Sequence, residues 1–136
     1  MGAIEIRRID HVVLRVRDVA AAKRFYCDAL GCTVERESAA LGLFQLRAGA
    51  SLIDLVPVDG PLGRLGGAAP GAEARNVDHV ALNLARFDET AIRAQLAKHG
   101  VTPGDVAERY GADGNGPSMY VRDPDGNVVE LKGPPR

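Results

Sequence analysis

The stretch Ser118–Lys132, SMYVRDPDGNVVELK, determines how the rest of the chain is interpreted. Two runs of alternating apolar residues flank Pro124-Asp125-Gly126, in which proline presets the first turn position and glycine supplies the left-handed residue of a three-residue hairpin loop. Counting outward from that loop places Tyr120 opposite Glu130 and Ser118 opposite Lys132. The sequence therefore predicts a β-hairpin with a defined register.

The two faces of this hairpin differ in chemistry, because residues opposite one another share a face of the sheet. The apolar face is predicted to be buried and carries Met119, Val121, Val129 and Leu131. The polar face carries Ser118, Tyr120, Arg122, Glu130 and Lys132. Such a face is either solvated surface or the floor of a site.

Length and composition limit the possible classes of protein. The chain has 136 residues, enough for one domain with a real core, and its formal net charge is −1. It offers no basic patch for nucleic acid, no run long enough to span a membrane and no apolar leader at its start. Cys27 and Cys32 form no disulfide framework and are interpreted as small hydrophobic residues. We therefore expect a cytoplasmic protein that binds neither nucleic acid nor membranes.

The first half of the chain has a β-α-β-β-β pattern. Ile9–Val16, IDHVVLRV, alternates as a strand that places His11, Val13 and Arg15 on one face. Asp18 is a predicted N-cap of a helix that Gly31 ends, and three short strands follow at 33–37, 43–47 and 51–56. This first module covers about residues 4–58.

The second half repeats the first after a connector at about 59–76. The connector is rich in Gly, Pro and Ala, and we interpret it as an unstructured linker or mobile flap. Val77–Leu84, VDHVALNL, then repeats the first strand, and Asp88 is the predicted N-cap of a second helix. An extended piece near Val106–Arg109 and the hairpin complete a module at about 77–133. The additional residues of this module are assigned to Gly111–Pro117, as a loop able to close over a site.

The repeat aligns four side chains that are typical metal ligands. His11 and His79 occupy the same position of the two first strands, and Asp54 and Glu130 the same position of the two last strands. If the modules pack symmetrically, the four converge on one divalent transition metal, Zn²⁺, Ni²⁺, Co²⁺, Mn²⁺ or Fe²⁺. The alternative is that both histidines are hydrogen-bonded structural residues, but two of only three histidines share one repeat position. Asp54 is shorter than Glu130, so it ligates directly, acts through water or only lines the cavity.

Further polar residues are candidates for contact with a substrate. Tyr120 faces Glu130, so it is placed to orient that carboxylate or to donate a proton to substrate. Ser118 and Arg122 share this face and are candidates for holding an oxyanion, although Arg122 lies close to the turn. Arg15 has the parity of His11 and is a candidate for binding an anionic substrate. Lys132 is interpreted as a rim charge.

These residues resemble the vicinal oxygen chelate superfamily, which includes glyoxalase I, bleomycin-resistance proteins, fosfomycin-resistance transferases, methylmalonyl-CoA epimerases and extradiol dioxygenases. The resemblance rests on the two modules, the paired DHV strands, FYCDALG and YVRDPDGNVVEL, and it covers essentially the whole chain. It implies an α+β fold in which eight strands form an open cup, and a homodimer. By position, His11, His79 and Glu130 match the family's ligands, and Asp54 lies near its more variable ligand.

The resemblance also implies a choice of functions. The first is a metal-dependent lyase or isomerase of glyoxalase type, in which Glu130 or Asp54 moves a proton of a small oxygen-chelating substrate through an enediolate. Asp54 departs from the Glu or Gln usual in glyoxalases and epimerases. The second is an Fe(II) dioxygenase of extradiol type that uses His11, His79 and Glu130. The third is a metal-free drug-binding protein of bleomycin-resistance type, which the low aromatic content of 4% disfavours. A fosfomycin-type transferase is a further possibility, since Ser118 and Tyr120 match cavity positions of that branch.

Overall fold

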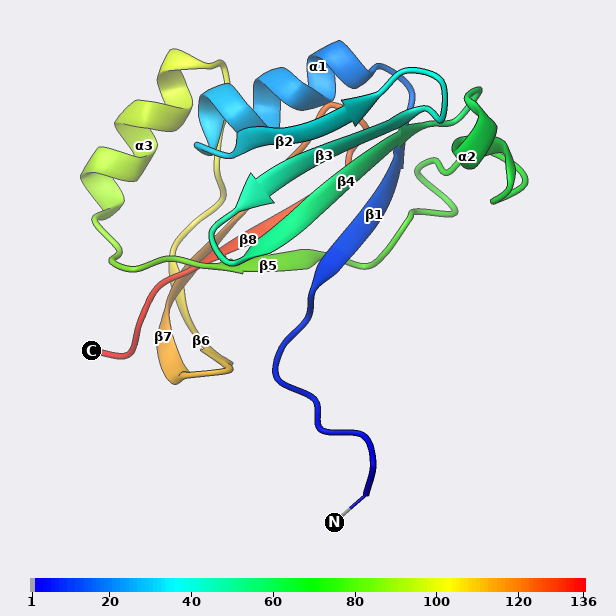
Figure 1. Ribbon diagram of the computed structural model, residues 1–136. Coiled ribbons are helices and arrows are strands. Elements are labelled where there is room, and N and C mark those ends of the chain that lie inside the picture. The colour runs from blue at the N-terminus through cyan, green and yellow to red at the C-terminus, as the bar shows by residue number, and fades with distance from the viewer. Residues whose placement is uncertain (1) are drawn as a thin grey trace.

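The computed structural model describes residues 2–136 and contains two four-stranded sheets (Figure 1). The first sheet has the order β1-β4-β3-β2 and consists of β1 (His11–Val16), β2 (Thr33–Ser38), β3 (Leu43–Ala48) and β4 (Ser51–Pro57). The second has the order β5-β8-β7-β6 and consists of β5 (Val80–Asn83), β6 (Ala107–Gly111), β7 (Gly114–Arg122) and β8 (Val128–Lys132). In each sheet the first and last strands pair in parallel and the other pairs are antiparallel. The predicted α+β fold of two open β-α-β-β-β modules is confirmed.

Each module carries its helix after the first strand, and a side chain fixes the start of each helix. Helix α1 (Val19–Lys23) begins at Asp18, whose carboxylate accepts a hydrogen bond from the Ala21 backbone N–H at 3.0 Å. Helix α3 (Glu89–Lys98) begins at Asp88, which accepts from the Ala91 N–H at 3.1 Å. Both predicted N-caps are confirmed, because each satisfies a backbone donor that the first helical turn leaves free.

The helix of the first module continues as a π-helix, η1 (Arg24–Ala29), which the sequence did not predict. Its adjacent residues Phe25 and Tyr26 are both buried, and their rings lie edge to face at 4.9 Å. The helix of the first module therefore contributes two aromatic rings to the core.

The hairpin β7–β8 has the register that its sequence predicts. Tyr120 pairs with Glu130 and Ser118 with Lys132. The loop is closed by a hydrogen bond from the Asp123 N–H to the Asn127 carbonyl at 2.9 Å, and Gly126 has a φ of +82°. The glycine is required there because other residues adopt that conformation only at a cost.

The apolar faces of both sheets and the inner faces of the helices share one core. It includes Leu14 and Val16 of β1 and Val129 and Leu131 of β8, together with Leu96 of α3. Because side chains alternate across a strand, the polar faces of both sheets point away from this core. None of the helices in residues 2–136 is long and apolar enough to cross a membrane.

A buried polar seam joins the two modules. The Tyr26 hydroxyl on η1 donates to Asp123 Oδ2 in the β7–β8 turn at 2.8 Å, and both residues are buried. Asn76, just before the second module, donates to the Arg15 carbonyl at 3.0 Å and to Asn127 Oδ1 at 3.2 Å. Burial, followed by the Asp123 charge, raises the pKa of Tyr26, so its hydroxyl stays protonated as a donor. These bonds fix the orientation of one module relative to the other.

Two predictions about loops are wrong. The connector contains a short helix, α2 (Pro61–Arg64), and is held against β1 by Arg15. The Arg15 side chain donates to the carbonyls of Gly63 at 3.1 Å, Gly66 at 3.1 Å and Gly67 at 2.6 Å. The segment Gly111–Pro117 is not a closing loop: it forms the tight β6–β7 turn and the beginning of β7, which has nine residues where β3 has six.

Candidate metal centre

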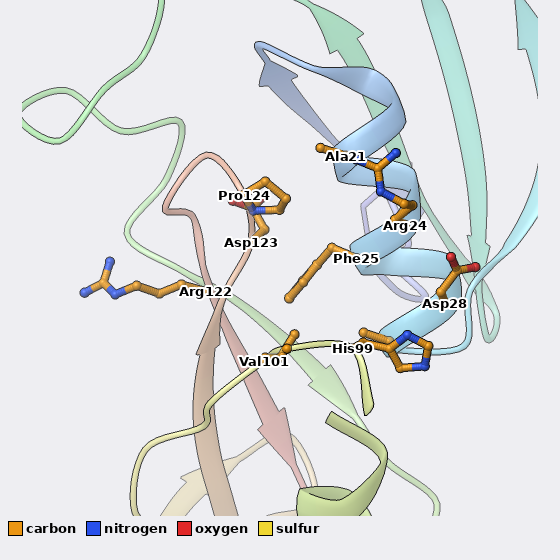
Figure 2. A pocket seen from close by; sticks show the side chains of 11 residues that line it. Ala21, Arg24, Phe25, Asp28, His99, Val101, Arg122, Asp123 and Pro124 are labelled. Atoms are coloured by element: carbon orange, nitrogen blue, oxygen red, sulfur yellow. The ribbon is translucent and has the colours of Figure 1, made fainter. Parts of the chain in front are cut away.

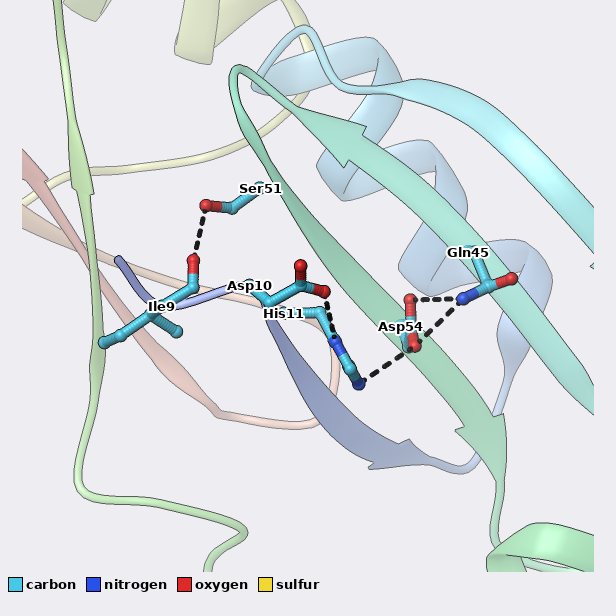
Figure 3. Close-up of polar contacts among 6 residues, drawn as sticks. All are labelled: Ile9, Asp10, His11, Gln45, Ser51 and Asp54. Atoms are coloured by element: carbon cyan, nitrogen blue, oxygen red, sulfur yellow. Dashed lines mark hydrogen bonds and ion pairs between the residues drawn. The ribbon is translucent and has the colours of Figure 1, made fainter. Parts of the chain in front are cut away.

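The first candidate pair, His11 and Asp54, lies on the polar face of the first sheet (Figure 3). Parallel pairing of β1 with β4 sets His11 Nε2 4.0 Å from Asp54 Oδ2. Gln45 on β3 faces Asp54 and donates through Nε2 to both of its carboxylate oxygens, at 3.3 and 3.2 Å. Asp54 is buried and His11 is half exposed, so the imidazole edge is open to a ligand from outside the chain.

The second pair, His79 and Glu130, repeats this arrangement on the second sheet. His79 Nε2 lies 3.4 Å from Glu130 Oε1, and Glu130 is buried. Tyr120, opposite Glu130 in the β7–β8 register, meets the His79 ring edge to face at 5.8 Å between centroids. Tyr120 therefore borders both members of the pair, in the position that its sequence predicts.

Both histidines are anchored in the same way through their other ring nitrogen. His11 Nδ1 is 2.8 Å from Asp10 Oδ1, and His79 Nδ1 is 2.6 Å from Asp78 Oδ1. A carboxylate at Nδ1 favours the tautomer with hydrogen there, which leaves the Nε2 lone pair directed at Asp54 or Glu130. The hydrogen bond to Asp10, and then the Asp54 charge, raise the pKa of His11.

This donor set fits a divalent metal ion. An Nε2 lone pair that faces a carboxylate oxygen is a repulsive contact unless a cation or a proton lies between the two. A carboxylate that holds the Nδ1–H of a ligating histidine is also the usual support of such ligands. Each pair by itself offers one nitrogen and one or two oxygens, which is half of a typical coordination shell.

The two pairs do not meet within one chain. In residues 2–136, no group of three or more His, Cys, Asp and Glu side chains is close enough together to hold a metal ion. The reason is the shared core, which turns the polar faces of the two sheets away from each other. The chain therefore holds its four predicted ligands as two separate pairs.

The other predicted site residues, Ser118, Arg122 and Arg15, lie in three different environments. Ser118 is buried on the polar face of the second sheet and accepts a hydrogen bond from Arg109 Nη1 at 2.7 Å. Arg122 is exposed near the turn and donates to the Gly126 carbonyl at 3.2 Å. The Arg15 guanidinium makes its hydrogen bonds to the connector, which gives it a structural role in this chain.

Sequence reasoning missed several residues that the structure adds. Asp10 and Asp78 anchor the histidines, and the repeated Asp-His dipeptide was the visible signal for this role. Gln45 orients Asp54, and only the β3–β4 register reveals it. Arg109 stacks on Tyr120, with its guanidinium carbon 4.4 Å from the ring centroid.

Two pockets lie close to the second module. The pocket in Figure 2 has a volume of about 380 Å³ and lies between η1, the end of α3 and the β7–β8 turn. Phe25 and Val101 point into it, but neither histidine–carboxylate pair lines it. A second pocket of about 530 Å³ is bounded by Tyr120 and Val128 on the polar side of β7 and β8. It borders the candidate centre only through Tyr120, because neither His79 nor Glu130 lines it.

Exposed apolar side chains flank His11 along the chain. Ile9 and Val13, two residues to either side of His11, are 79% and 45% exposed. Ile4 and Ile6, on the extended segment before β1, are each 85% exposed. In addition, β1 and β5 are edge strands of their sheets. Apolar residues and open strand edges next to a half-site are typical of a surface that another chain covers.

Comparisons with known proteins identify the family and the fold. A model of the Glyoxalase/Bleomycin resistance protein/Dioxygenase superfamily matches residues 8–131. The chain is 28% identical to Virulence protein STM3117 of Salmonella typhimurium, over 93% of this chain and 83% of that protein. The crystal structure of STM3117 superposes with a TM-score of 0.73 and covers 97% of this chain and all of that one.

Two further relatives differ from each other in length and in name. An integron cassette protein from V. cholerae is 28% identical, with a TM-score of 0.73, and the match covers 97% of this chain and 98% of that one. Metapyrocatechase 2 of Cupriavidus necator is 31% identical over 93% of this chain. The chain spans only 33% of that protein's length. The relatives thus differ in length and in the names they carry, and the two with known structures share the fold of this chain.

Proposed function

Because the chain belongs to the Glyoxalase/Bleomycin resistance protein/Dioxygenase superfamily, we propose that it is a metal-dependent lyase or isomerase of glyoxalase type. Its substrate is a small molecule that offers two adjacent oxygens to the metal. The observation that carries this proposal is the repeated unit of a histidine anchored at Nδ1 by an aspartate, with its Nε2 directed at a buried carboxylate.

The metal site is proposed to be completed by two copies of this chain. A twofold dimer brings the His11–Asp54 pair of one copy against the His79–Glu130 pair of the other, and symmetry creates two such sites. Three features support this: the pairs lie on outward faces, each pair is half of a coordination shell, and exposed Ile9 and Val13 flank His11. Association also removes these apolar side chains from water, which favours the dimer.

Each residue then has a role in the chemistry. A divalent metal, when bound, supplies stabilisation of negative charge on the adjacent oxygens of the substrate. Glu130, buried beside His79, accepts the proton from the carbon next to the substrate carbonyl and returns it. Asp54, the equivalent carboxylate, is held through both oxygens by Gln45 and serves as a ligand. Tyr120 lies opposite Glu130 and orients it or donates to the substrate.

A dioxygenase is the second candidate function, and the identity of 31% with Metapyrocatechase 2 favours it. In that case His11, His79 and Glu130 form a two-histidine, one-carboxylate set for Fe²⁺. The metal is therefore not fixed among Zn²⁺, Ni²⁺, Co²⁺, Mn²⁺ and Fe²⁺. We also propose a cytoplasmic location, because Cys27 and Cys32 are both free thiols.

Metal content and proton exchange test the proposal. Protein purified without chelator is loaded with each of the five ions, and bound metal is measured by mass spectrometry. We expect about one ion per chain, and loss of the ion in His11→Ala and His79→Ala but not in the matched control His99→Ala. The loaded protein is then incubated in D₂O with α-hydroxyketones and hemithioacetals. Exchange of the C–H next to the carbonyl, followed by NMR and abolished in Glu130→Gln, is expected.

Other outcomes of the same experiment contradict the proposal. Selective loading with iron and oxygen uptake with catechols would establish the dioxygenase instead. No binding of any ion would show that the two pairs are not ligands and would favour a metal-free binding protein.

A further inference from the structure

The polar face of the second sheet continues beyond the candidate centre into a patch of positive charge. Lys132 follows Glu130 by two residues on β8, so the two side chains share a face and their backbones are about 7 Å apart. Ser118 lies opposite Lys132 on β7, and Arg109 comes from β6 next to Ser118. We call Arg109, Ser118 and Lys132 the cationic end of this face.

Lys132 is a buried cation without a carboxylate partner. The residue is 5% exposed, and its Nζ donates to the Gly133 carbonyl at 2.9 Å. Its side chain packs over Gly116 and Gly111, where a Cβ would lie 2.9 Å from Nζ and 3.2 Å from Cε. Within residues 2–136, no carboxylate oxygen lies within 4.0 Å of Nζ. Burying a positively charged side chain without an ion-pair partner costs free energy. An anionic ligand bound nearby would offset this cost.

Arg109 is a second cation close to the candidate centre. Its guanidinium stacks on Tyr120, which borders both His79 and Glu130. Only Nη1 is engaged among the described residues: it donates to the Ser118 carbonyl at 2.9 Å and to Ser118 Oγ at 2.7 Å. The remaining N–H groups of the fork are therefore free to bind an anion, the ligand that a guanidinium matches best.

One carboxylate besides Glu130 lies in the neighbourhood. Asp113, in the β6–β7 turn, accepts a hydrogen bond from Asn83 at 2.9 Å, and Asn83 pairs with Lys132 between β5 and β8. Asp113 is exposed and is not within 4.0 Å of either cation. It therefore ties the turn to β5 and does not pair with either cation.

We propose that the cationic end binds an anionic group, a carboxylate or a phosphate, on the same substrate that chelates at His79 and Glu130. This inference rests on the proposed function and narrows its substrate class to molecules with two ends. One end carries adjacent oxygens, and the other carries a negative charge about 7 Å away, the spacing of Glu130 and Lys132 along β8. Arg109 makes the hydrogen bonds, Ser118 holds its guanidinium in place, and the buried Lys132 supplies positive charge.

The first test uses the metal-free protein and inorganic phosphate, so it does not depend on the metal. We expect saturable shifts of the Ser118 and Lys132 amide signals in NMR spectra, with roughly millimolar affinity. Lys132→Met keeps the length of the side chain and removes the charge, and it should abolish the shifts. Arg109→Lys keeps the charge, loses the fork and should weaken binding. Lys98→Met, an exposed lysine of α3, is the matched control and should not change them. Circular dichroism confirms that each variant is folded.

The second test uses the metal-loaded protein and two chelators of the same shape, 3,4-dihydroxybenzoate and 3,4-dihydroxybenzamide. We expect the acid to bind about tenfold more tightly than the amide, the effect of roughly one charge-assisted hydrogen bond. Lys132→Met should remove this preference and leave affinity for the amide within about twofold.

The outcomes separate the two proposals. A loaded wild type that binds both chelators equally, or a metal-free protein with no phosphate shifts at Ser118 and Lys132, overturns the cationic end and leaves the metal enzyme intact. A chain that takes up no metal overturns the proposed function and, with it, the assignment of an anionic substrate.

Discussion

Replacing Tyr26 by phenylalanine removes one hydroxyl from the seam that fixes the two modules relative to each other. The hydroxyl donates to Asp123 Oδ2 at 2.8 Å, and the Tyr26 side chain is fully buried. Asp123 keeps three other donors: the N–H groups of Asp125 and Asn127 at 2.9 and 2.8 Å, and Asn127 Nδ2 at 2.8 Å. The carboxylate therefore keeps three of its four hydrogen bonds.

The expected cost follows from these contacts. A hydrogen bond to a charged group contributes about 1.5–3 kcal/mol, and phenylalanine fills the same volume without creating a cavity. We expect the free energy of unfolding of Tyr26→Phe to fall by that amount. For a chain of this length, Tm should then fall by roughly 5–10 °C.

The assay is guanidinium denaturation followed by circular dichroism, with Tyr110→Phe as control. Tyr110 is 80% exposed, so its hydroxyl should contribute less than about 0.5 kcal/mol. If Tyr26→Phe were as stable as Tyr110→Phe, the seam would not hold the modules in this orientation. The shared core alone would then determine how the two modules pack.

Two further predictions concern the pairs themselves. Glu130→Gln should reduce turnover of any substrate by about 10²–10⁴-fold. Asp54→Asn should reduce it much less, because only Glu130 is assigned to proton transfer. Equal losses in kcat would show that the two carboxylates share this role. In the metal-free protein, Asp10→Asn should lower the raised pKa of His11, read from its ring protons by NMR, while Asp78→Asn leaves that pKa unchanged. Because the folded pKa is raised, His11 stabilises the metal-free fold below its unfolded pKa of about 6.5, and this contribution is lost as pH rises through the folded pKa. Asp10→Asn should therefore weaken stability at pH 5.5 more than at pH 8.5, and an equal effect at both would contradict the assignment.

The local structure could be predicted from the sequence wherever a single residue type strongly favours one backbone geometry. Gly126 set the turn, the turn set the register, and the register set the two faces of the hairpin. Asp18 and Asp88 marked the helix starts for the same reason. The π-helix had no such signal, because no single residue of Arg24–Ala29 requires that geometry.

The arrangement of the site could be predicted only in part. The repeat identified His11, Asp54, His79 and Glu130, and the structure does pair each histidine with its carboxylate. The direction in which the pairs face depends on how the two modules pack, and that follows from the Tyr26–Asp123 seam and the shared core. Contacts between residues far apart in sequence, such as Arg109 on Tyr120, are likewise invisible to spacing along the chain.

The measurement that tests the central claim most directly is complementation between two defective chains. His11→Ala and His79→Ala are coexpressed with different affinity tags, and the heterodimer is isolated through both tags. If each metal site combines the halves of two chains, one site of the heterodimer is intact and the other lacks both histidines. The heterodimer should then bind about half the wild-type metal, while each mutant homodimer binds none. A heterodimer without metal, beside a wild type that binds it, would contradict the account and place every ligand within one chain.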